Sequence, residues 1–445
     1  MKPNILFILA DSMRSDRCFA KNKTINTPNI DSLISKGVYF QQAISSSDYT
    51  ITGYGSIFTG LFPINAGISG MSYHKIFANV PNYIDLLKNY GYHTYAIMDG
   101  WSTKMGFSSF FENEDYEYDR TKTSLFDGLG GKILGKFESD EFKEPWFYFI
   151  HLEDLHIPIR VPDEFSDKKY SERYDLAVEN IDLWLGRILE KINLKNTIVI
   201  FTADHGDYIL SIDDAKKNSL NQEIKSKIRE KIPNSTYDFF ARKKRQTQRK
   251  IKLSLTQSAL LKRSIDTRTA EERYLFDDVI HIPFLIAGAN IPQLGVLPDM
   301  IRNVDFFPTI AELISLPENT RKTNGRSLVP LLHGQPMEEE PAYLENTIFA
   351  TDTKSPIPCI GIRTSQYKYF RAHNNSQERI HLFDLKNDPL EENNLVDDEP
   401  NTIKTMEELL SKIRKNLLSN FEEPSSLTDE ETKNVEDELK KLGYI

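Results

Sequence analysis

Four short, continuously apolar runs are the most regular feature of the sequence, and each ends in polar or small residues. They cover residues 4–12 (NILFILADS), 146–156 (WFYFIHLEDLH), 197–207 (TIVIFTADHGD) and 282–289 (IPFLIAGA). Strands that are apolar on both sides are typical of a parallel sheet covered by helices on both faces. The runs therefore predict four buried strands of one central sheet.

Segments with apolar residues at intervals of three and four lie between these runs. They are residues 27–37 (TPNIDSLISKG), 80–91 (VPNYIDLLKNYG) and 172–192 (ERYDLAVENIDLWLGRILEKI). This spacing places the apolar side chains on one face of a helix. Strands that alternate with helices indicate an α/β fold with a mostly parallel central sheet flanked by helices. In such a sheet, ligands bind beyond the carboxyl ends of the strands.

Two segments interrupt this alternation. Residues 208–270 carry 16 Lys and Arg against 6 Asp and Glu, although the whole chain of 445 residues has a net charge of −10. From about residue 336 the apolar runs become shorter and lead into an acidic, polar C-terminus, as in a small α+β subdomain. The expected organisation is an α/β domain over 1–335 with a basic insertion at 208–270, followed by a C-terminal subdomain over 336–445.

Composition narrows the class of protein. Apolar residues make up 39% of the chain and charged residues 27%, which is ordinary for a soluble globular protein. The net negative charge argues against nucleic acid as the main partner. Cys18 and Cys359 form neither a disulfide framework nor a CxxC metal site. No apolar run matches a signal peptide or approaches the roughly 18 residues of a membrane span, so the sequence predicts a cytoplasmic protein.

Carboxylates and a histidine follow directly after the predicted strands. Asp204 and His205 come at the end of the run at 197–207, and Asp11 follows the first run. Carboxylate oxygens and imidazole nitrogens are common ligands of divalent metals. Each residue also has an ordinary explanation, because Asp-His-Gly suits a turn and Asp is a common helix N-cap. The joint pattern favours a metal site, since the two strands would end at the same edge of the sheet.

A stretch rich in hydroxyl groups, SDYTITGYGSIFTGLFP at 47–63, offers candidate nucleophiles. A hydroxyl near a divalent cation loses its proton more easily and becomes a usable nucleophile. Composition does not choose among these hydroxyls, and a cap or turn is the ordinary role of each. The candidates are Ser45, Ser46, Ser47, Thr50, Thr52 and Ser56.

Ordered motifs along nearly the whole chain resemble those of the sulfatase family of the alkaline phosphatase superfamily. In order, they are NILFILADSMRSDR, TPNIDSLISKGVYFQQAIS, TGLFP, HLEDLHIP, TADHGD, YLFDDVIHIPFLIAG, NVDFFPTIAELISL, NGRSLVPLL, LFDLKNDPLEENNL and LKKLGYI. The family's nucleophile lies ten residues before the Gly of a Thr-Gly-x-x-Pro motif, which is Gly60 here and singles out Thr50. The resemblance implies an alkaline-phosphatase/sulfatase-like fold and a divalent metal.

The resemblance also implies a role for each candidate residue. Thr50 is the expected catalytic nucleophile. The expected metal ligands are Asp11, Thr50, Asp204 and His205, and the expected substrate contacts are His156, Asp154 and Arg273. Ligands of these types favour Mn²⁺ or Zn²⁺ over the all-oxygen site that Ca²⁺ prefers, with Ca²⁺ and Mg²⁺ left open.

The sequence departs from the family pattern at the nucleophile. Where most sulfatases have Cys or Ser in C/S-x-P-x-R, this chain has Thr50, Thr52 and Tyr54. Thr cannot become formylglycine, whose hydrate releases sulfate by collapsing to an aldehyde. A phospho-threonine, in contrast, can be attacked by water at phosphorus. Nucleotide pyrophosphatase/phosphodiesterase-like relatives and phosphoethanolamine or phosphoglycerol transferases use Thr at this place.

Further departures affect the residues that surround the family's anion. The paired Asp-Asp of arylsulfatases reads Asp11-Ser12, and their Lys-Trp-His is replaced around Met98–Trp101. A basic residue of the later core is also displaced, with Arg268 and Arg273 nearby. These departures weigh against simple arylsulfatase activity.

The basic insertion contains a segment, residues 236–252 (TYDFFARKKRQTQRKIK), that resembles an amphipathic helix on an anionic membrane surface. A solvated charged face is the ordinary explanation. Because the segment follows Asp204 and His205 in sequence, we expect it to flank the mouth of the site. Nucleic acid ranks lower as a partner, because the segment lacks interleaved aromatic residues.

These features together predict a metal-dependent hydrolase or phosphotransferase that uses Thr50. The expected substrate is a phosphate ester or diester of a small molecule, a glycan or a lipid-linked glycan, reached from the inner face of the membrane. Two alternatives stay open. One is a sulfuric ester hydrolase without formylglycine, and the other is a degenerate, non-catalytic module that binds a glycan or a membrane.

Overall fold

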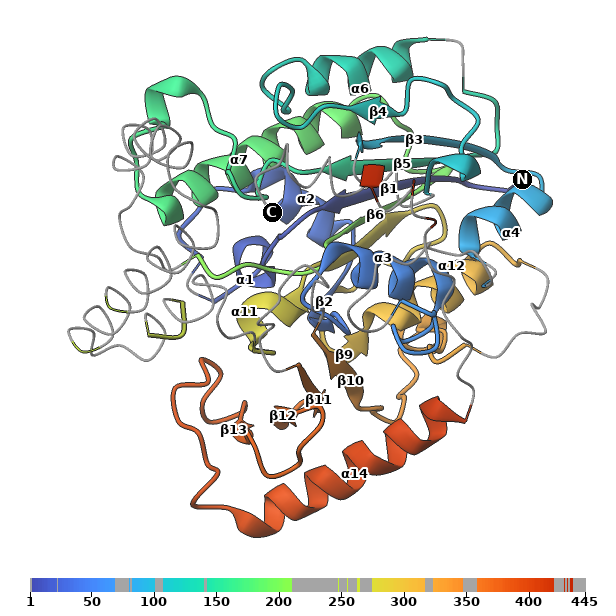
Figure 1. The fold of residues 1–445 in the computed structure, drawn as a ribbon. Coiled ribbons are helices and arrows are strands. Elements are labelled where there is room, and N and C mark those ends of the chain that lie inside the picture. The colour runs from blue at the N-terminus through green and yellow to red at the C-terminus, as the bar shows by residue number, and fades with distance from the viewer. Residues whose placement is uncertain are drawn as a thin grey trace.

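The computed structural model consists of a large central sheet with helices around it and a second, smaller sheet (Figure 1). It describes residues 2–21, 23–68, 80, 82–100, 107–139, 142–209, 262–264, 274–316, 323–346 and 358–419, and the single residues 247, 254, 428, 430, 433 and 434.

Nine strands of the described chain form the central sheet in the order β4-β3-β5-β1-β6-β8-β2-β7, with β9 also paired to β2. Their bounds are β1 (Asn4–Ala10), β2 (Gly37–Ile44), β3 (His93–Asp99), β4 (Glu117–Tyr118), β5 (Trp146–Leu152), β6 (Thr197–Thr202), β7 (His281–Ile282), β8 (Phe284–Gly288) and β9 (Gly295–Arg302). The strands β4, β3, β5, β1 and β6 are parallel neighbours, whereas β8 runs antiparallel to both β6 and β2.

The four predicted strands are confirmed as β1, β5, β6 and β8, in a mostly parallel sheet. Strand β1 is fully buried between β5 and β6, and its Leu9 lies opposite His151 on one side and Thr202 on the other. The carboxyl ends of these three strands are therefore side by side. The fourth predicted strand is divided at Pro283 into β7 and β8, since Pro has no backbone N–H for the ladder.

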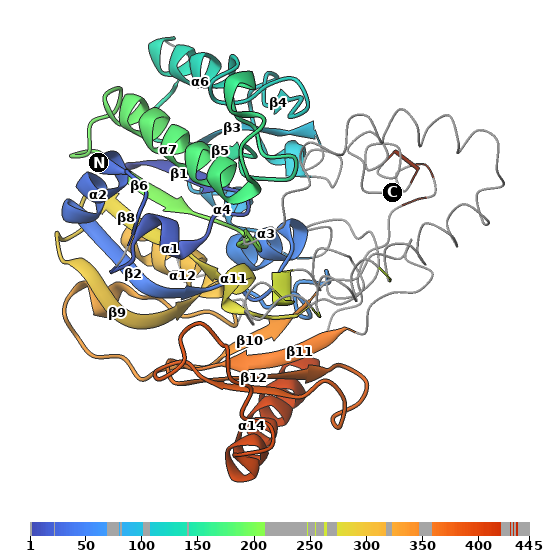
Figure 2. The same cartoon turned by 90° about the vertical axis from the view of Figure 1, so that its left-hand side faces the viewer.

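Two groups of helices flank the sheet, and the predicted helices are confirmed as α2, α4 and α7 (Figure 2). One group contains α2, α6 and α7, and the other contains α3, α4, α12 and α13. The helices are α1 (Ser15–Cys18), α2 (Pro28–Ser35), α3 (Thr50–Thr59), α4 (Tyr83–Asn89), α6 (Leu129–Glu138), α7 (Tyr170–Leu189), α11 (Asp277–Ile280), α12 (Phe306–Leu313), α13 (Val329–Leu332) and α14 (Pro400–Leu418), with 3₁₀ turns η1 (Phe107–Phe110), η2 (Asp163–Phe165) and η4 (Asn303–Asp305).

The start of α2 is held by a residue far away in sequence. The side chain of Thr27, its N-cap, makes no capping hydrogen bond. The buried carboxylate of Asp182 on α7 instead accepts hydrogen bonds from the backbone N–H groups of Asn29 (3.2 Å) and Ile30 (2.7 Å). These bonds satisfy donors that every helix leaves open at its first turn, and they fix α2 against α7.

The second sheet is antiparallel and supports the expected α+β character of the C-terminal region. Its strands follow in the order β10 (Ala342–Glu345), β11 (Cys359–Arg363), β12 (Tyr367–Ala372) and β13 (His381–Asp384). Helix α14 buries Met406 and Leu410 in a cluster with Tyr369 of β12. The domain boundary at residue 335 stays a prediction. The described helices include none with the length and apolar content of a membrane-spanning segment.

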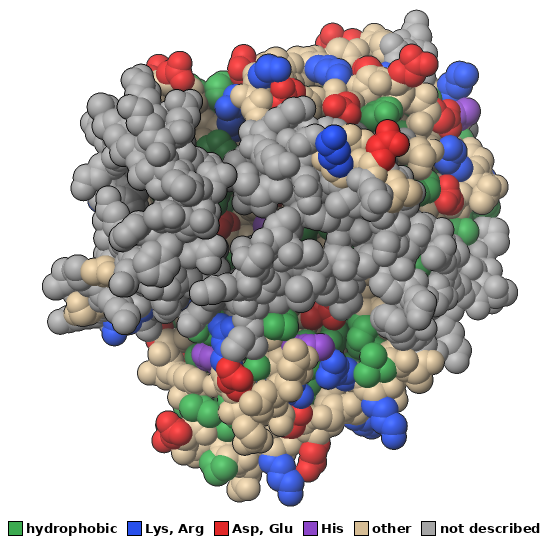
Figure 3. Space-filling view, viewed as in Figure 1, with side chains coloured by type: hydrophobic (Ala, Val, Ile, Leu, Met, Phe, Trp, Pro, Cys, Tyr) green, Lys and Arg blue, Asp and Glu red, His purple; other side chains and the backbone are tan. Residues whose placement is uncertain are grey.

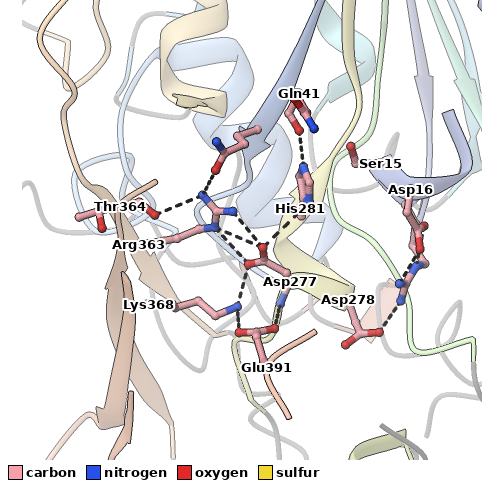
Figure 4. A network of polar contacts seen from close by, with 12 residues as sticks. Ser15, Asp16, Gln41, Asp277, Asp278, His281, Arg363, Thr364, Lys368 and Glu391 are labelled. Carbon is pink, nitrogen blue, oxygen red and sulfur yellow. Dashed lines mark hydrogen bonds and ion pairs between the residues drawn. The ribbon is translucent and has the colours of Figure 1, made fainter. Parts of the chain in front are cut away.

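A buried ionic network joins the second sheet to the central sheet (Figure 4). We call Asp277, Arg363, Lys368 and Glu391 the junction network. Asp277 lies 2.7 Å from Lys368 Nζ and 3.0 Å from Arg363 Nη2, and Lys368 also pairs with Glu391. Arg363 Nη1 donates to Gln42 Oε1 of β2 at 3.2 Å. Lys368 is entirely buried, so its ammonium group is stabilised by Asp277 and Glu391 and not by water.

Charge on the surface is distributed differently. In Figure 3, positive and negative side chains are interspersed over the lower, C-terminal part of the face shown. The basic segment predicted at 236–252 lies outside the described residues except for Thr247. Its contact with a membrane therefore stays a prediction.

Candidate active site

Thr50 is the first residue of α3 and is 4% exposed. Its Oγ1 donates to Asp11 Oδ2 at 3.1 Å and lies 3.4 Å from His205 Nε2. Because Thr50 begins α3, the positive end of the helix dipole lies at this hydroxyl. This end of a helix favours an anionic group. The structure thus brings the expected nucleophile together with the expected metal ligands.

The other five candidate hydroxyls bond elsewhere among the described residues. Ser45 Oγ donates to the backbone oxygen of Asp204 (2.6 Å), Ser46 Oγ to Ser56 Oγ (2.8 Å), and Thr52 Oγ1 to Ser47 Oγ (2.7 Å). These bonds attach the loop before α3 to the end of β6 and to the first turns of the helix. These hydroxyls therefore have structural partners, although none of them caps α3.

Gly53 explains how α3 approaches the end of β6 so closely. A Cβ at this position would lie 2.9 Å from the backbone oxygen of Asp204 and 3.0 Å from its Cβ. The missing side chain therefore sets the separation between Thr50, one helical turn before Gly53, and the Asp204 carboxylate.

Asp11, Asp204 and His205 form a cluster in which one ligand atom from each residue lies within 4.8 Å of the others. Asp204 Oδ1 accepts hydrogen bonds from the N–H groups of Ser12 (3.2 Å) and His205 (2.9 Å). Its Oδ2 is buried without a hydrogen-bond partner among the described residues and lies 3.6 Å from His205 Nε2. A buried carboxylate oxygen without a donor suits a divalent cation.

The backbone fixes the orientation of His205. Its Nδ1 donates to the backbone oxygen of Gly206 at 2.7 Å. A neutral imidazole with a proton on Nδ1 has its lone pair on Nε2. That nitrogen faces Thr50, so His205 fits the metal in chemistry as well as in position.

Burial and mutual charge shift the pKa values of the cluster in different directions. Burial, followed by the charge of Asp11, raises the pKa of Asp204 to about 6. Burial lowers the pKa of His205, but Asp204 and Asp11 more than offset this effect and raise it to about 8. Burial also raises the pKa of Asp11, yet the charge of His156 and the nearby imidazole of His151, 3.6 Å away, hold it well below its usual value. The carboxylates therefore depend on nearby positive charge.

His156 lies close enough to lower the pKa of Asp11, and His205 contributes to lowering the pKa of His156. Its role as a substrate contact stays a prediction. Its Nδ1 donates to the backbone oxygen of Ile157 at 2.8 Å. Burial lowers the pKa of His156 to about 4, so its imidazole is neutral near pH 7 in the free protein.

The two other expected substrate contacts have different outcomes. Asp154 is 2% exposed, and its Oδ1 accepts a hydrogen bond from the N–H of Leu125 at 3.0 Å. It does not belong to either group of metal-ligand atoms among the described residues, and its role in substrate binding stays a prediction. Arg273 lies outside the described residues.

A second group of charged residues lies around Asp11 and was not predicted from the sequence. His151 Nε2 lies 3.6 Å from Asp11 Oδ2, while its Nδ1 lies 3.3 Å from Asp99 Oδ1 and 3.9 Å from Glu153 Oε1. Arg120 pairs with Glu153. One signal was present, because His151 and Glu153 are two residues apart at a strand end and side chains with that spacing share a side.

Comparison with known proteins agrees with this geometry. The family model described as Sulfatase matches residues 3–316, and the model of the N-sulphoglucosamine sulphohydrolase C-terminal region matches residues 267–419. Arylsulfatase K of Gallus gallus is 22% identical over 93% of this chain and 82% of its own length. Ulvan-active sulfatase of Formosa agariphila is 23% identical over 100% of this chain and 85% of its own length.

A solved structure shows the same fold. BT4656, in complex with its substrate D-glucosamine-2-N,6-O-disulfate, matches with a TM-score of 0.65 at 16% sequence identity. The match covers 94% of this chain and 99% of the BT4656 chain. The family model matches well over half of the chain, and the sheet order and the site at its edge fit that match. The chain therefore belongs to the sulfatase family and is an enzyme with that family's alkaline-phosphatase-like α/β fold.

Proposed function

We propose that this enzyme cleaves or transfers a phosphate ester or diester of a glycan, with Thr50 as the nucleophile. The observation that carries the proposal is the position of the Thr50 hydroxyl, which faces Asp11 and His205 at 3.1 and 3.4 Å. A threonine side chain has to react as a hydroxyl, because it cannot form the aldehyde of formylglycine. A phosphorylated threonine is then cleared by attack of water at phosphorus, as in other two-step covalent mechanisms.

The names of similar proteins support the saccharide part of the proposal. One relative is named for its action on ulvan, and one structural neighbour was solved with a sulfated glucosamine as its substrate. We infer a sugar ester as the substrate class for this chain on that basis. Whether water or a second hydroxyl receives the transferred group decides between a hydrolase and a transferase.

The residues present fit a divalent metal. Asp11, Asp204 and His205 would hold it beside Thr50, and nitrogen together with oxygen ligands favours Mn²⁺ or Zn²⁺. Such an ion would lower the pKa of a nearby hydroxyl and would stabilise the negative charge on the group being transferred.

The described side chains have separate tasks in the first step. Asp11 Oδ2 accepts the hydrogen bond of the Thr50 hydroxyl and so orients Oγ1 toward the site. The hydroxyl proton passes to solvent, and Oγ1 then attacks phosphorus while the bond from phosphorus to the leaving oxygen breaks. A bound anionic ester raises the pKa of His156, which takes up a proton and gives it to the leaving oxygen. In the second step water gives a proton to His156 and attacks phosphorus, and the bond from phosphorus to Thr50 Oγ1 breaks.

Turnover of p-nitrophenyl phosphate, bis-p-nitrophenyl phosphate and p-nitrophenyl sulfate, each with added Mn²⁺, Zn²⁺, Ca²⁺ or Mg²⁺, tests the proposal. One of the two phosphate substrates should be turned over fastest. Thr50→Ala should reduce its turnover at least ~10³-fold, because the nucleophile is lost. Thr52→Ala is the matched control, since this hydroxyl bonds to Ser47 and Tyr49 instead, and it should stay within about tenfold of the unaltered chain.

Two results would contradict the proposal. Faster turnover of the sulfate than of both phosphates would reject the preference for phosphorus. Equal losses in Thr50→Ala and Thr52→Ala would reject the assignment of the nucleophile. Acid quenching of a reaction with radiolabelled phosphate substrate adds a direct measurement, because the label should be recovered on the peptide that carries Thr50.

Hydrolysis of a sulfate ester is the second candidate, and the family and the names of the relatives favour it. Threonine would then have to release sulfate without an aldehyde, which requires attack of water at sulfur. A non-catalytic binding module has less support, because four ligand-type residues from three separate parts of the chain meet at one buried point.

A further inference from the structure

A cavity of about 260 Å³ lies where α1, α11 and the C-terminal region meet. Asp16 and Arg17 of α1 line one side, Asp278 of α11 lines another, and residues 389–391 line a third. We call it the junction cavity, because Glu391 of the junction network forms part of its wall. Ligand sites occur preferentially where separate parts of a fold meet, so the junction cavity is a candidate binding site.

The wall of the junction cavity is continuous with the active site. Arg14 lines the cavity and follows the expected metal ligand Asp11 closely in the sequence. Its Nη1 donates to the backbone oxygen of Asp207 at 3.1 Å, and Asp207 follows the expected ligand His205 in the same way. The segments that carry these two ligands therefore also hold one side of the cavity in place.

The charged groups of the cavity wall are paired with one another. Arg14 Nη2 lies 2.9 Å from Asp16 Oδ2, and Arg14 Nη1 pairs with Asp278. Arg17 Nη1 lies 3.1 Å from Asp16 Oδ2. Arg263 Nη2 pairs with Asp278 as well. A charged ligand would have to compete with these pairs and separate buried partners, which is costly. The wall therefore suits a ligand that is polar but uncharged.

Paired ions of this kind still bind hydroxyl groups. An ionised carboxylate has about four lone-pair directions, and a guanidinium has five N–H donors. Asp16 and Arg17 are paired and yet partly exposed, so part of each group is accessible from the cavity. A hydroxyl group donates to the carboxylate and accepts from the guanidinium without separating the pair.

His281 adds a neutral acceptor to the wall. Its Nε2 donates to the backbone oxygen of Gln41 at 2.8 Å, as Figure 4 shows. Burial lowers the pKa of His281, so the imidazole is neutral near pH 7 and carries a lone pair on Nδ1. Asp277 Oδ2 lies 4.0 Å from Nδ1, which is too far for a direct hydrogen bond. A ligand hydroxyl fits this nitrogen as a donor.

Apolar side chains complete the wall of the junction cavity. Leu390 is 53% exposed, although it is a large apolar residue, and Pro389 and Ile209 line the cavity beside it. A few polar groups that converge on an apolar surface are typical of small-molecule sites. The combination matches a sugar ring, because its faces present C–H groups and its edge presents hydroxyl groups.

The backbone that carries Leu390 is held in an unfavourable conformation. Glu391 has a φ of 56°, in the left-handed region that residues with a Cβ usually avoid. Its Oε2 accepts from the N–H of Asp277 at 2.8 Å, and Lys368 pairs with the same carboxylate. Strain of this kind persists where the surroundings enforce it, and it is concentrated at ligand-binding and catalytic sites.

We propose that the junction cavity binds an uncharged sugar residue of the saccharide on which the enzyme acts. The paired ions of α1 and α11 bind its hydroxyl groups, and Leu390 packs against one face of its ring. The choice of a sugar as the ligand rests on the saccharide part of the proposed function. Binding in the cavity involves neither the nucleophile nor the group transferred, so it is measured separately from turnover.

Saturation-transfer difference NMR with the full chain tests the proposal. The neutral probes are the methyl glycosides of glucose, galactose and N-acetylglucosamine, and the anionic probes are those of glucuronic and galacturonic acid. At least one neutral probe should bind more tightly than both anionic probes. Leu390→Ser should weaken its binding about fivefold or more, as for an apolar side chain that contacts the ligand. Leu294→Ser is the matched control, because Leu294 is similarly exposed (43%) and does not line the cavity. It should bind like the unaltered chain.

A second variant keeps the test decisive if Leu390→Ser does not fold. Asp16→Asn should also weaken binding of the neutral probe, whereas Asp119→Asn, at an exposed carboxylate paired with Lys122, should not.

Three results would overturn the proposal. They are equal binding by the unaltered chain and both cavity variants, tighter binding of an anionic probe, and no binding of any neutral probe. Turnover separates this proposal from the proposed function. A chain that binds the neutral sugar through Leu390 and Asp16 but turns over neither phosphate substrate would reject the proposed reaction and leave the sugar site in place.

Discussion

The chain buries two groups of charged side chains that are built in different ways. In the junction network acids and bases are in direct contact, with Asp277 lying 2.7 Å from Lys368 Nζ and 3.0 Å from Arg363 Nη2. Around the active site the carboxylates lie 3.3–3.9 Å from the nitrogens of His151. Asp204 also keeps one oxygen without a hydrogen-bond donor among the described residues.

This difference separates structural charge from functional charge. The junction network supplies its own cations and therefore holds two sheets together without help. Among the residues that the structure describes, the carboxylates at the active site lie farther from their neighbouring cationic groups, and a metal ion or protonated histidines would balance their charge. Buried charge of this kind lowers the stability of the free protein and is retained where it serves binding or catalysis.

Removal of a cation from the junction network should have the largest effect on stability. Lys368→Met leaves Asp277 and Glu391 buried beside each other with less compensation. We expect the free energy of unfolding to fall by about 3–5 kcal/mol, as for other broken buried pairs. Urea denaturation measures it. Lys404→Met, the same change at an exposed position of α14, should stay within about 0.5 kcal/mol of the unaltered chain.

Equal stability of Lys368→Met and Lys404→Met would contradict the structural role assigned to the junction network. The junction network would then be no more than a set of weak contacts. A large loss confined to Lys368→Met would show that direct pairing carries the connection between the sheets.

The position of Thr50 relative to Asp204 should depend on the close contact between Gly53 and the backbone of Asp204. Gly53→Ala places a methyl group 2.9 Å from the backbone oxygen of Asp204 and pushes Thr50 away from its partners. We expect kcat/KM to fall by about 10²-fold, the usual cost of a displacement near 1 Å. Gly131→Ala in α6 meets nothing within 4 Å. It should leave kcat/KM unchanged and add about 0.5–1 kcal/mol of stability. A loss of turnover in both variants would contradict this explanation.

The same substitution should have opposite effects in the two clusters. Asp204→Asn removes one of the active-site carboxylates, so the metal-free protein should gain about 1–2 kcal/mol of unfolding free energy. Asp277→Asn removes a paired carboxylate and should lower it. Thermal denaturation in chelator measures both. Added Mn²⁺ should stabilise the unaltered chain more than Asp204→Asn. A loss of stability in metal-free Asp204→Asn would show that its carboxylate is compensated within the protein.

The sequence was sufficient for the elements whose pattern is local. Strands β1, β5 and β6 are apolar throughout, and α7 repeats its apolar residues at helical intervals, so each was predicted from its own residues. Strand β2 was not predicted from its pattern. Its burial is interrupted only at Gln41 and Gln42, and two antiparallel strands and one parallel strand pair with it. Such neighbours are set by topology.

The site was predictable to the extent that strand ends could be placed. Asp11, Asp204 and His205 follow buried strands that meet at one edge, and the family register added Thr50. The part played by His151 was missed, because it depends on β5 lying next to β1, where His151 falls opposite Leu9. A single sequence does not state which strands are neighbours. The roles of the other hydroxyls likewise required the positions of their partners.

The smallest predicted effect is a pH dependence that belongs to the junction network. Burial raises the pKa of Asp277, but Arg363 and Lys368 more than offset it and hold the pKa well below its ordinary value. A carboxyl with a depressed folded pKa stabilises the protein above the unfolded value of about 3.9, and this contribution is lost as the pH falls toward the folded pKa. Below pH ~4 the unaltered chain should therefore lose stability faster than Asp277→Asn, by up to about 1.4 kcal/mol per pH unit. Urea denaturation from about pH 5 to pH 3 measures both slopes. Parallel slopes would mean that Asp277 titrates alike in the folded and unfolded chain, and the contrast with the active-site carboxylates would then rest on geometry alone.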